Sequence, residues 1–191
     1  MRYSLVTKAL HALLALSIVH QLLVSLIMDE PKFNRPIETP FLLHQWVGIT
    51  SLVIVVAFWL WTLARRGESS FGAFLPWFSS ARRQAVLADL RAYAAALPRL
   101  KLPDSAAHTA FANAVHGLGL LIASFMAATG LVIYLQMTPE GRIFGIGHLM
   151  KELHETGGTL MWIYLIGHGA MALLHQVMGE KILRKMWTIS G

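Results

Sequence analysis

The chain has 191 residues, of which 55% are hydrophobic and 14% charged, and its mean hydropathy is +0.55. Soluble domains carry about 25% charged residues, so this composition excludes an ordinary soluble domain and predicts a membrane protein. The absence of cysteine excludes disulfides, thiolate metal sites and iron–sulfur clusters. The net charge of +6 is explained by basic loops of a membrane protein, so binding to nucleic acid is not expected.

Four apolar stretches, each long enough to cross a bilayer, follow one another along the chain. We expect membrane-spanning helices at residues 5–28, 41–64, 111–136 and 149–178. The first stretch is too long for a cleaved signal sequence and lacks a small-residue cleavage site. The sequence therefore predicts an all-α fold, an integral membrane four-helix bundle that forms a single domain over residues 1–191.

The second and third spans are joined by a long polar connection, residues 65–108. Residues 82–97 carry apolar side chains at helical spacing, so we expect an amphipathic helix that lies on the membrane surface. Four apolar residues shortly before this helix are expected in the membrane interface: Phe74, Leu75, Trp77 and Phe78. Arg65 and Arg66 follow the second span as a basic stop signal.

The distribution of basic residues predicts the orientation of the spans. Most of the 16 Lys and Arg residues lie before the first span, in the connection 65–108, and after the fourth span. The last group is a basic tail with Lys181, Arg184 and Lys185. Since positive charge accumulates in cytoplasmic loops, both termini and the connection 65–108 are expected in the cytoplasm.

Histidines at matching depths are the most informative feature of these spans. His154 and His168 lie fourteen residues apart, which places them ~40° apart on one helix face at ~100° per residue. They are separated by ~21 Å along the helix at ~1.5 Å per residue. With the predicted orientation, His44 lies at the outer depth of His154, and His11 lies at the inner depth of His168. Ionisable side chains inside a membrane are costly and are candidates for function.

Two pairs of imidazoles at opposite sides of the membrane indicate axial ligands to two haems. His44 and His154 would hold an outer haem, and His11 and His168 an inner one. The separation of ~21 Å is too long for one shared tetrahedral zinc site. Small residues next to the ligands would leave room for the macrocycles, and they are Gly48, Gly157, Gly158, Gly167 and Gly169.

Other side chains qualify as accessory groups. His175 shares the face of His168 and is its rival as the inner ligand, and His116 lies at the inner depth of the third span. His116 is expected to touch the inner haem, a propionate or a quinone, or to bridge two helices. Lys151 and Arg142 are expected near the outer surface, where they would bind propionates, attract an anion, or anchor the chain at the interface.

These residues also carry a family pattern. The segment from His154 through His168, and His44 in Leu42-Leu43-His44-Gln45-Trp46-Val47-Gly48, resemble the bacterial cytochrome b561 family of di-haem membrane proteins. The chain departs from the family pattern at Ala12 and Leu153, where tryptophan is common. The resemblance implies haem b held by His11 with His168 and by His44 with His154, and it implies the bacterial inner membrane as the location.

The resemblance further implies electron transfer between a periplasmic redox partner and the quinone pool, with ubiquinone as substrate. Its sharpest form is an enzyme that oxidises superoxide and reduces ubiquinone. Membrane lipid, a quinone and a periplasmic redox protein are the expected partners, and a homodimer is left open. The first alternative is a haem b subunit that anchors a periplasmic dehydrogenase or hydrogenase. The second alternative is a membrane transporter without haem. The lack of buried carboxylates within the spans argues against it, because transporters typically carry them there.

Overall fold

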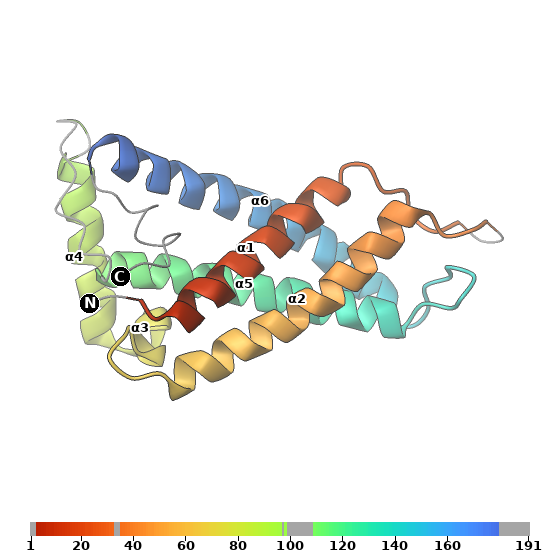
Figure 1. The fold of residues 1–191 in the computed structure, drawn as a ribbon, viewed down its shortest axis with the longest axis horizontal. Helices are drawn as coiled ribbons and strands as arrows, with labels where there is room; N and C mark the ends of the chain where they lie inside the picture. Colours follow the sequence, from red (N-terminus) through yellow and green to blue (C-terminus); the bar gives the residue numbers. More distant parts are fainter. Residues whose placement is uncertain (1–2, 33–34, 97, 99–108, 180–191) are drawn as a thin grey trace. The chain divides into compact units, whose positions relative to one another are not determined.

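The computed structural model describes residues 3–32, 35–96, 98 and 109–179, and in this part of the chain every regular element is a helix (Figure 1). The four long helices are α1 (Leu5–Val24), α2 (Thr39–Ala64), α5 (Ala110–Leu135) and α6 (Gly147–Val177). Between α2 and α5 lie α3 (Phe71–Phe74), the 3₁₀-helix η1 (Pro76–Phe78) and α4 (Ser80–Ala96). The predicted all-α fold is confirmed, while the basic tail with Lys181, Arg184 and Lys185 lies outside the described residues.

Among the described residues, these four helices are long and apolar enough to cross a membrane. The 26 residues of α5 extend about 39 Å at about 1.5 Å per residue, more than the hydrocarbon thickness of about 30 Å. Large apolar side chains stay exposed along the helices: Val53 is 64% exposed, and Ile163 is 65% exposed. Soluble proteins rarely leave such continuous apolar surface in water, so these faces are suited to lipid.

The helix boundaries differ slightly from the predicted ones. The first helix ends at Val24, and residues 25–27 form a turn rather than a further turn of helix. The second helix starts two residues early and includes Pro40. Proline is accepted there because the first backbone N–H groups of a helix have no intrahelical partner to lose. The fourth helix begins at Gly147, two residues before the predicted start.

The described chain forms two compact units, and each of the four long helices contributes residues to both. Unit 2 comprises Ala9–Phe58 and Leu121–Ile163. Apolar side chains from all four of its helical segments form its buried core: Leu14, Leu22, Val55, Phe58, Ala123 and Met161. Gly157 lets α6 approach α5 closely, because a Cβ there would lie 2.6 Å from Sδ of Met126. Gly157 is thus a packing residue of the helix pair.

Unit 1 comprises Met1–Lys8, Trp59–Leu120 and Tyr164–Gly191, apart from the residues that the structure does not describe. Its core includes Phe74, which is 6% exposed. Phe74 therefore packs within the protein, whereas Trp77 and Phe78, expected beside it in the membrane interface, are 45% and 85% exposed. A Cβ on Gly117 would lie 1.9 Å from the carbonyl oxygen of Phe74, so the backbone of α3 rests directly on α5. This close approach gives Phe74 its place inside the protein.

A buried ion pair follows α2. The side chains of Arg65 and Glu68 are 2% and 5% exposed, and Nη1 of Arg65 lies 3.2 Å from Oε2 of Glu68. Glu68 also accepts hydrogen bonds from the backbone N–H of Ser4 at 2.9 Å and from Oγ1 of Thr7 at 2.8 Å. The indole of Trp61 donates to the same Thr7 oxygen at 2.8 Å. The start of the chain is thereby tied to the end of α2.

The predicted amphipathic helix in the connection is α4, which runs from Ser80 to Ala96. Asp89 and Tyr93, one turn apart on this helix, contact α5. The carboxylate of Asp89 accepts a hydrogen bond from the backbone N–H of Phe111 at 2.9 Å, and the ring of Tyr93 lies 5.6 Å from the Phe111 ring. Leu87 and Leu90 are 48% and 46% exposed. Those two leucines form the part of its apolar side that the protein leaves uncovered.

Candidate functional site

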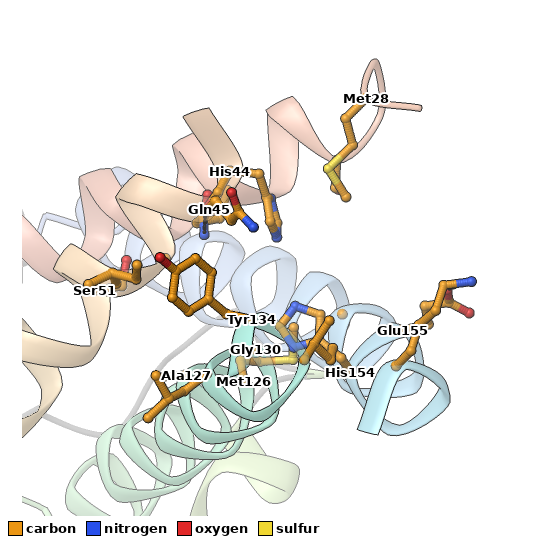
Figure 2. Close-up of a pocket in the computed structure, with 18 of the residues that line it drawn as sticks. Met28, His44, Gln45, Ser51, Met126, Ala127, Gly130, Tyr134, His154 and Glu155 are labelled. Carbon is orange, nitrogen blue, oxygen red and sulfur yellow. Dashed lines mark hydrogen bonds and ion pairs between the residues drawn. The ribbon is translucent and has the colours of Figure 1, made fainter. Parts of the chain in front are cut away.

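Two histidines from different helices face each other in unit 2. His44 lies in the second turn of α2 and His154 in the third turn of α6. Their ring centroids are 6.1 Å apart, with an angle of 82° between the ring planes. Figure 2 shows the two rings turned towards each other. A metal–imidazole bond is about 2 Å long and the ring centroid lies about 1 Å behind the bonded nitrogen, so two trans imidazoles have centroids about 6 Å apart. The observed spacing suits one metal ion between the rings.

The two rings line a cavity of about 520 Å³ that lies entirely within unit 2. Apolar side chains from four helices supply most of its wall, among them Leu14, Ile18, Val55, Met126 and Leu131. Gly48 and Gly158 also line it, as expected for residues that leave room beside the histidines. Cofactor sites are typically cavities of roughly 300–1,000 Å³ with apolar walls and few polar groups. This cavity therefore has the size and character of a site for a flat, largely apolar cofactor.

The backbone of His44 is held by a side chain from α1. Nε2 of Gln21 donates a hydrogen bond to the carbonyl oxygen of His44 at 2.9 Å. Gly48 leaves space for this contact, since a Cβ there would lie 2.9 Å from the same Gln21 nitrogen. Among the described residues, the buried Nδ1 of His44 has no hydrogen-bond partner. His44 is thus held through its backbone, while its Nδ1 makes no hydrogen bond to the described residues.

The other histidine is fixed through its ring. Nδ1 of His154 lies 2.9 Å from Oγ1 of Thr129 on α5. A Cβ on Gly130 would lie 3.2 Å from Cε1 of His154, so the ring packs against the α5 backbone at this point. With Nδ1 engaged by the protein, Nε2 is the nitrogen that can bind a metal ion in the cavity.

Charged residues lie at one edge of the cavity wall. Nζ of Lys151 is 2.6 Å from Oε1 of Glu30 and 3.3 Å from Oε1 of Glu155, and all three residues contribute to the lining. The charge of Lys151 is therefore compensated by two carboxylates. This weakens the idea that Lys151 attracts an anion by itself. Arg142 is exposed and lies next to the lining residues Gly141 and Ile143, without being one of them.

Unit 1 contains a second pair of neighbouring histidines. The rings of His116 on α5 and His168 on α6 have centroids 5.2 Å apart, and a ring nitrogen of one lies within 4.8 Å of a ring nitrogen of the other. Nδ1 of His116 lies 2.8 Å from the carbonyl oxygen of Ala112, to which it can only donate. Tyr164, one turn before His168, stacks on its ring at 5.4 Å. His11 belongs to unit 2, and its pairing with His168 stays a prediction.

His175 has a different neighbour. It is 6% exposed, its ring meets the Tyr93 ring edge-on at 5.9 Å, and its Nε2 lies 3.4 Å from the Tyr93 hydroxyl oxygen. His175 therefore contributes to the contact between α4 and α6. This contact gives the predicted rival of His168 a structural role near the end of α6.

A model of the family described as prokaryotic cytochrome b561 matches residues 2–189 of the chain. The chain belongs to the prokaryotic cytochrome b561 family. No curated protein and no solved structure matches it. Membership of this cytochrome family, together with the four apolar helices, identifies a bacterial membrane protein that binds haem b and transfers electrons.

The residues of unit 2 fit the haem b of a cytochrome b561. The 6.1 Å separation of the facing imidazoles, the apolar cavity of about 520 Å³ and the uncommitted Nδ1 of His44 agree with a macrocycle held between two axial histidines. His44 and His154 are the residues that would bind its iron. Haem supplies a redox centre that takes up or gives up one electron, and the surrounding protein tunes it through ligation, hydrogen bonding and burial.

Two polar residues around this site were not predicted from the sequence. Gln21 and Thr129 each contact one of the facing histidines. The sequence offers little to distinguish Thr129 from Thr50, another threonine inside an apolar span. The one available signal is that Gly130 follows Thr129 directly, so that a small residue adjoins a hydroxyl at the depth of His154.

Proposed function

We propose that this cytochrome is a single membrane domain with two haem b groups that links a redox partner on the periplasmic side to the quinone pool. His44 with His154 would hold one haem, and His11 with His168 the other. The facing of His44 and His154 across an apolar cavity is the observation that carries the proposal. The ~21 Å between His154 and His168 along α6 is the reason for proposing two separate haems.

The proposed location is the bacterial inner membrane with both termini in the cytoplasm. It is supported by the basic residues before α1 and in the connection between α2 and α5. In this orientation the cavity of unit 2 lies towards the periplasm. The carboxylates of Glu30 and Glu155 beside Lys151 would then form part of the surface that a periplasmic electron donor approaches.

The chain's own residues contribute binding, orientation and exclusion of water. Gln21 and Thr129 each hold one of the two facing histidines, so little rearrangement is needed to present their ring nitrogens. Leu14, Val55 and Met126 keep the cavity wall apolar, and burial is one of the factors that set the reduction potential of a haem.

The sharpest form of the proposal is oxidation of superoxide coupled to reduction of ubiquinone. Two superoxide ions would each lose one electron and become dioxygen, and ubiquinone would take up these two electrons with two protons from the cytoplasm to become ubiquinol. The alternative is a subunit that collects electrons from a periplasmic dehydrogenase or hydrogenase. Activity of the purified chain with superoxide and a soluble ubiquinone analogue favours the first form, whereas co-purification with an iron–sulfur protein favours the second.

Haem content tests the proposal directly. We expect the purified protein to contain two haem b groups per chain, measured as the pyridine haemochrome. His44→Ala and His154→Ala should each lose the same haem, and His11→Ala and His168→Ala the other. A wild-type protein without the α-band of haem b, or a His44→Ala variant that retains both haems, would overturn the assignment.

A further inference from the structure

In the hydrogen bond between His154 and Thr129, the neighbouring hydrogen bonds of Thr129 determine which residue is the donor. Oγ1 of Thr129 lies 2.9 Å from the carbonyl oxygen of Phe125 and 3.1 Å from that of Met126. A hydroxyl has one hydrogen, and these carbonyl oxygens can only accept it. When that hydrogen is donated to the backbone, Oγ1 of Thr129 is left as an acceptor towards Nδ1 of His154, 2.9 Å away.

This arrangement matches what an axial histidine requires. A neutral imidazole that binds iron through Nε2 carries its proton on Nδ1, and a buried N–H without an acceptor is destabilised. Thr129 is only 4% exposed, so water does not easily replace it as the acceptor. From these contacts we propose that Thr129 is the positioning residue of the periplasmic haem ligand: it fixes the tautomer and the orientation of His154 and makes its imidazole a stronger electron donor.

The two ligands of this site then differ in their surroundings. In the described part of the chain, Nδ1 of His44 has no hydrogen-bond partner, whereas Nδ1 of His154 is held by Thr129. Gly130 contributes by leaving the α5 surface open next to Cε1 of His154. Without a side chain at this position, the ring can lie close enough to α5 to reach the neighbouring hydroxyl.

An ordinary threonine in a membrane helix provides the comparison. Such residues commonly donate their hydroxyl to a carbonyl of the preceding turn and do nothing else. Thr50 on α2 does this, since its Oγ1 lies 3.0 Å from the carbonyl oxygen of Trp46. Thr50 is exposed. Thr50→Val therefore removes the same hydroxyl from the same kind of helix without affecting a histidine, and it serves as the matched control.

The inference rests on the proposed haem between His44 and His154, and it is tested on the full chain purified with its haems. Thr129→Val keeps the shape of the side chain but removes the hydroxyl acceptor, while the Met126 backbone remains a hydrogen-bond partner of His154. We expect the midpoint potential of the periplasmic haem to rise, because a less electron-rich imidazole stabilises oxidised iron less. We also expect this haem to be retained about 10–100-fold more weakly, the usual effect of losing a hydrogen-bond partner of a metal-binding histidine. The other haem should keep its potential.

Two further variants separate positioning from packing. Thr129→Ser restores the acceptor and should return the potential to the wild-type value, while Thr129→Cys offers only a weak sulfur acceptor and should give a raised potential. This pair decides the question even where Thr129→Val fails to assemble. An unchanged potential in Thr129→Val or Thr129→Cys, or an equal rise in Thr50→Val, would refute the role of Thr129. The proposed function would still hold in that case, because it fails where the wild type lacks the α-band of haem b or where His44→Ala or His154→Ala retains both haems.

Discussion

Replacement of Glu68 by Gln is expected to destabilise the protein by about 3–5 kcal/mol, the cost of removing one partner from a buried ion pair. The side chains of Arg65 and Glu68 are 2% and 5% exposed. Glu68 accepts hydrogen bonds from Ser4 and Thr7 in addition to its contact with Arg65. Hydrogen bonds to a charged group are each worth about 1.5–3 kcal/mol. They act on one carboxylate and are not additive, so the figure for the whole pair is the better guide.

The ion pair of Lys151 with Glu30 provides a demanding control. Its N–O distance of 2.6 Å is shorter than the 3.2 Å between Arg65 and Glu68, but the Glu30 side chain is 67% exposed. Exposed ion pairs typically contribute about 0.2–1 kcal/mol. Glu30→Gln should therefore cost less than about 1 kcal/mol, even though the substitution is chemically the same and breaks the shorter contact.

Thermal unfolding of the two variants in the same detergent, followed by circular dichroism, measures the difference. For a chain of this length, each kcal/mol shifts the midpoint by roughly 2–4 °C. Glu68→Gln should lower Tm by about 6–20 °C, and Glu30→Gln by less than about 4 °C. Equal shifts for the two variants would refute the reasoning that burial, rather than the distance between the charged atoms, determines the stability of these pairs.

The same carboxylate predicts how stability depends on pH. Burial raises the pKa of Glu68, but the hydrogen bonds from Ser4 and Thr7 and the guanidinium of Arg65 lower it by more, so its pKa lies below the ordinary value of 4.5. The Glu68 carboxylate is therefore protonated less readily in the folded protein than in the unfolded chain. The contribution of Glu68 is complete above about pH 4.5 and is lost as the pH falls through the lower, folded-state pKa. As the pH is lowered from neutral to acidic, Tm should therefore fall less steeply in Glu68→Gln than in the wild type. The same dependence of Tm on pH in both proteins would contradict this.

Two further predictions concern packing and ligation. Gly117→Ala should prevent stable folding of unit 1, because its Cβ would overlap the Phe74 carbonyl oxygen. A yield and a Tm equal to those of the wild type would disprove this account. His116→Ala should retain both haems, whereas His11→Ala should lose one. The pyridine haemochrome gives the number of haems per chain. The reverse result would make His116, rather than His11, the partner of His168.

Much of this protein is decided by local properties of the sequence. The four spans follow from the length and hydropathy of the apolar stretches, since a bilayer accepts only helices of sufficient length whose backbone groups are paired internally. The shared face of His154 and His168 follows from helical periodicity alone. The family followed from short motifs around these histidines, and it is confirmed. Errors at the helix ends were small and occurred where, as at Pro40, the first turn tolerates a residue that usually ends helices.

The tertiary structure decided which side chains meet across helices. Apart from the glycine that follows Thr129, nothing local distinguishes Thr129 from Thr50, and nothing local distinguishes the buried ion pair of Glu68 from the exposed one of Glu30. Thr129 acquires its role because the packing of α5 against α6 brings its hydroxyl to Nδ1 of His154. Glu68 acquires its role because the chain folds back onto Ser4 and Thr7. Such contacts depend on how helices far apart in sequence pack, so hydropathy and periodicity can indicate a ligand but cannot identify the residue that holds it.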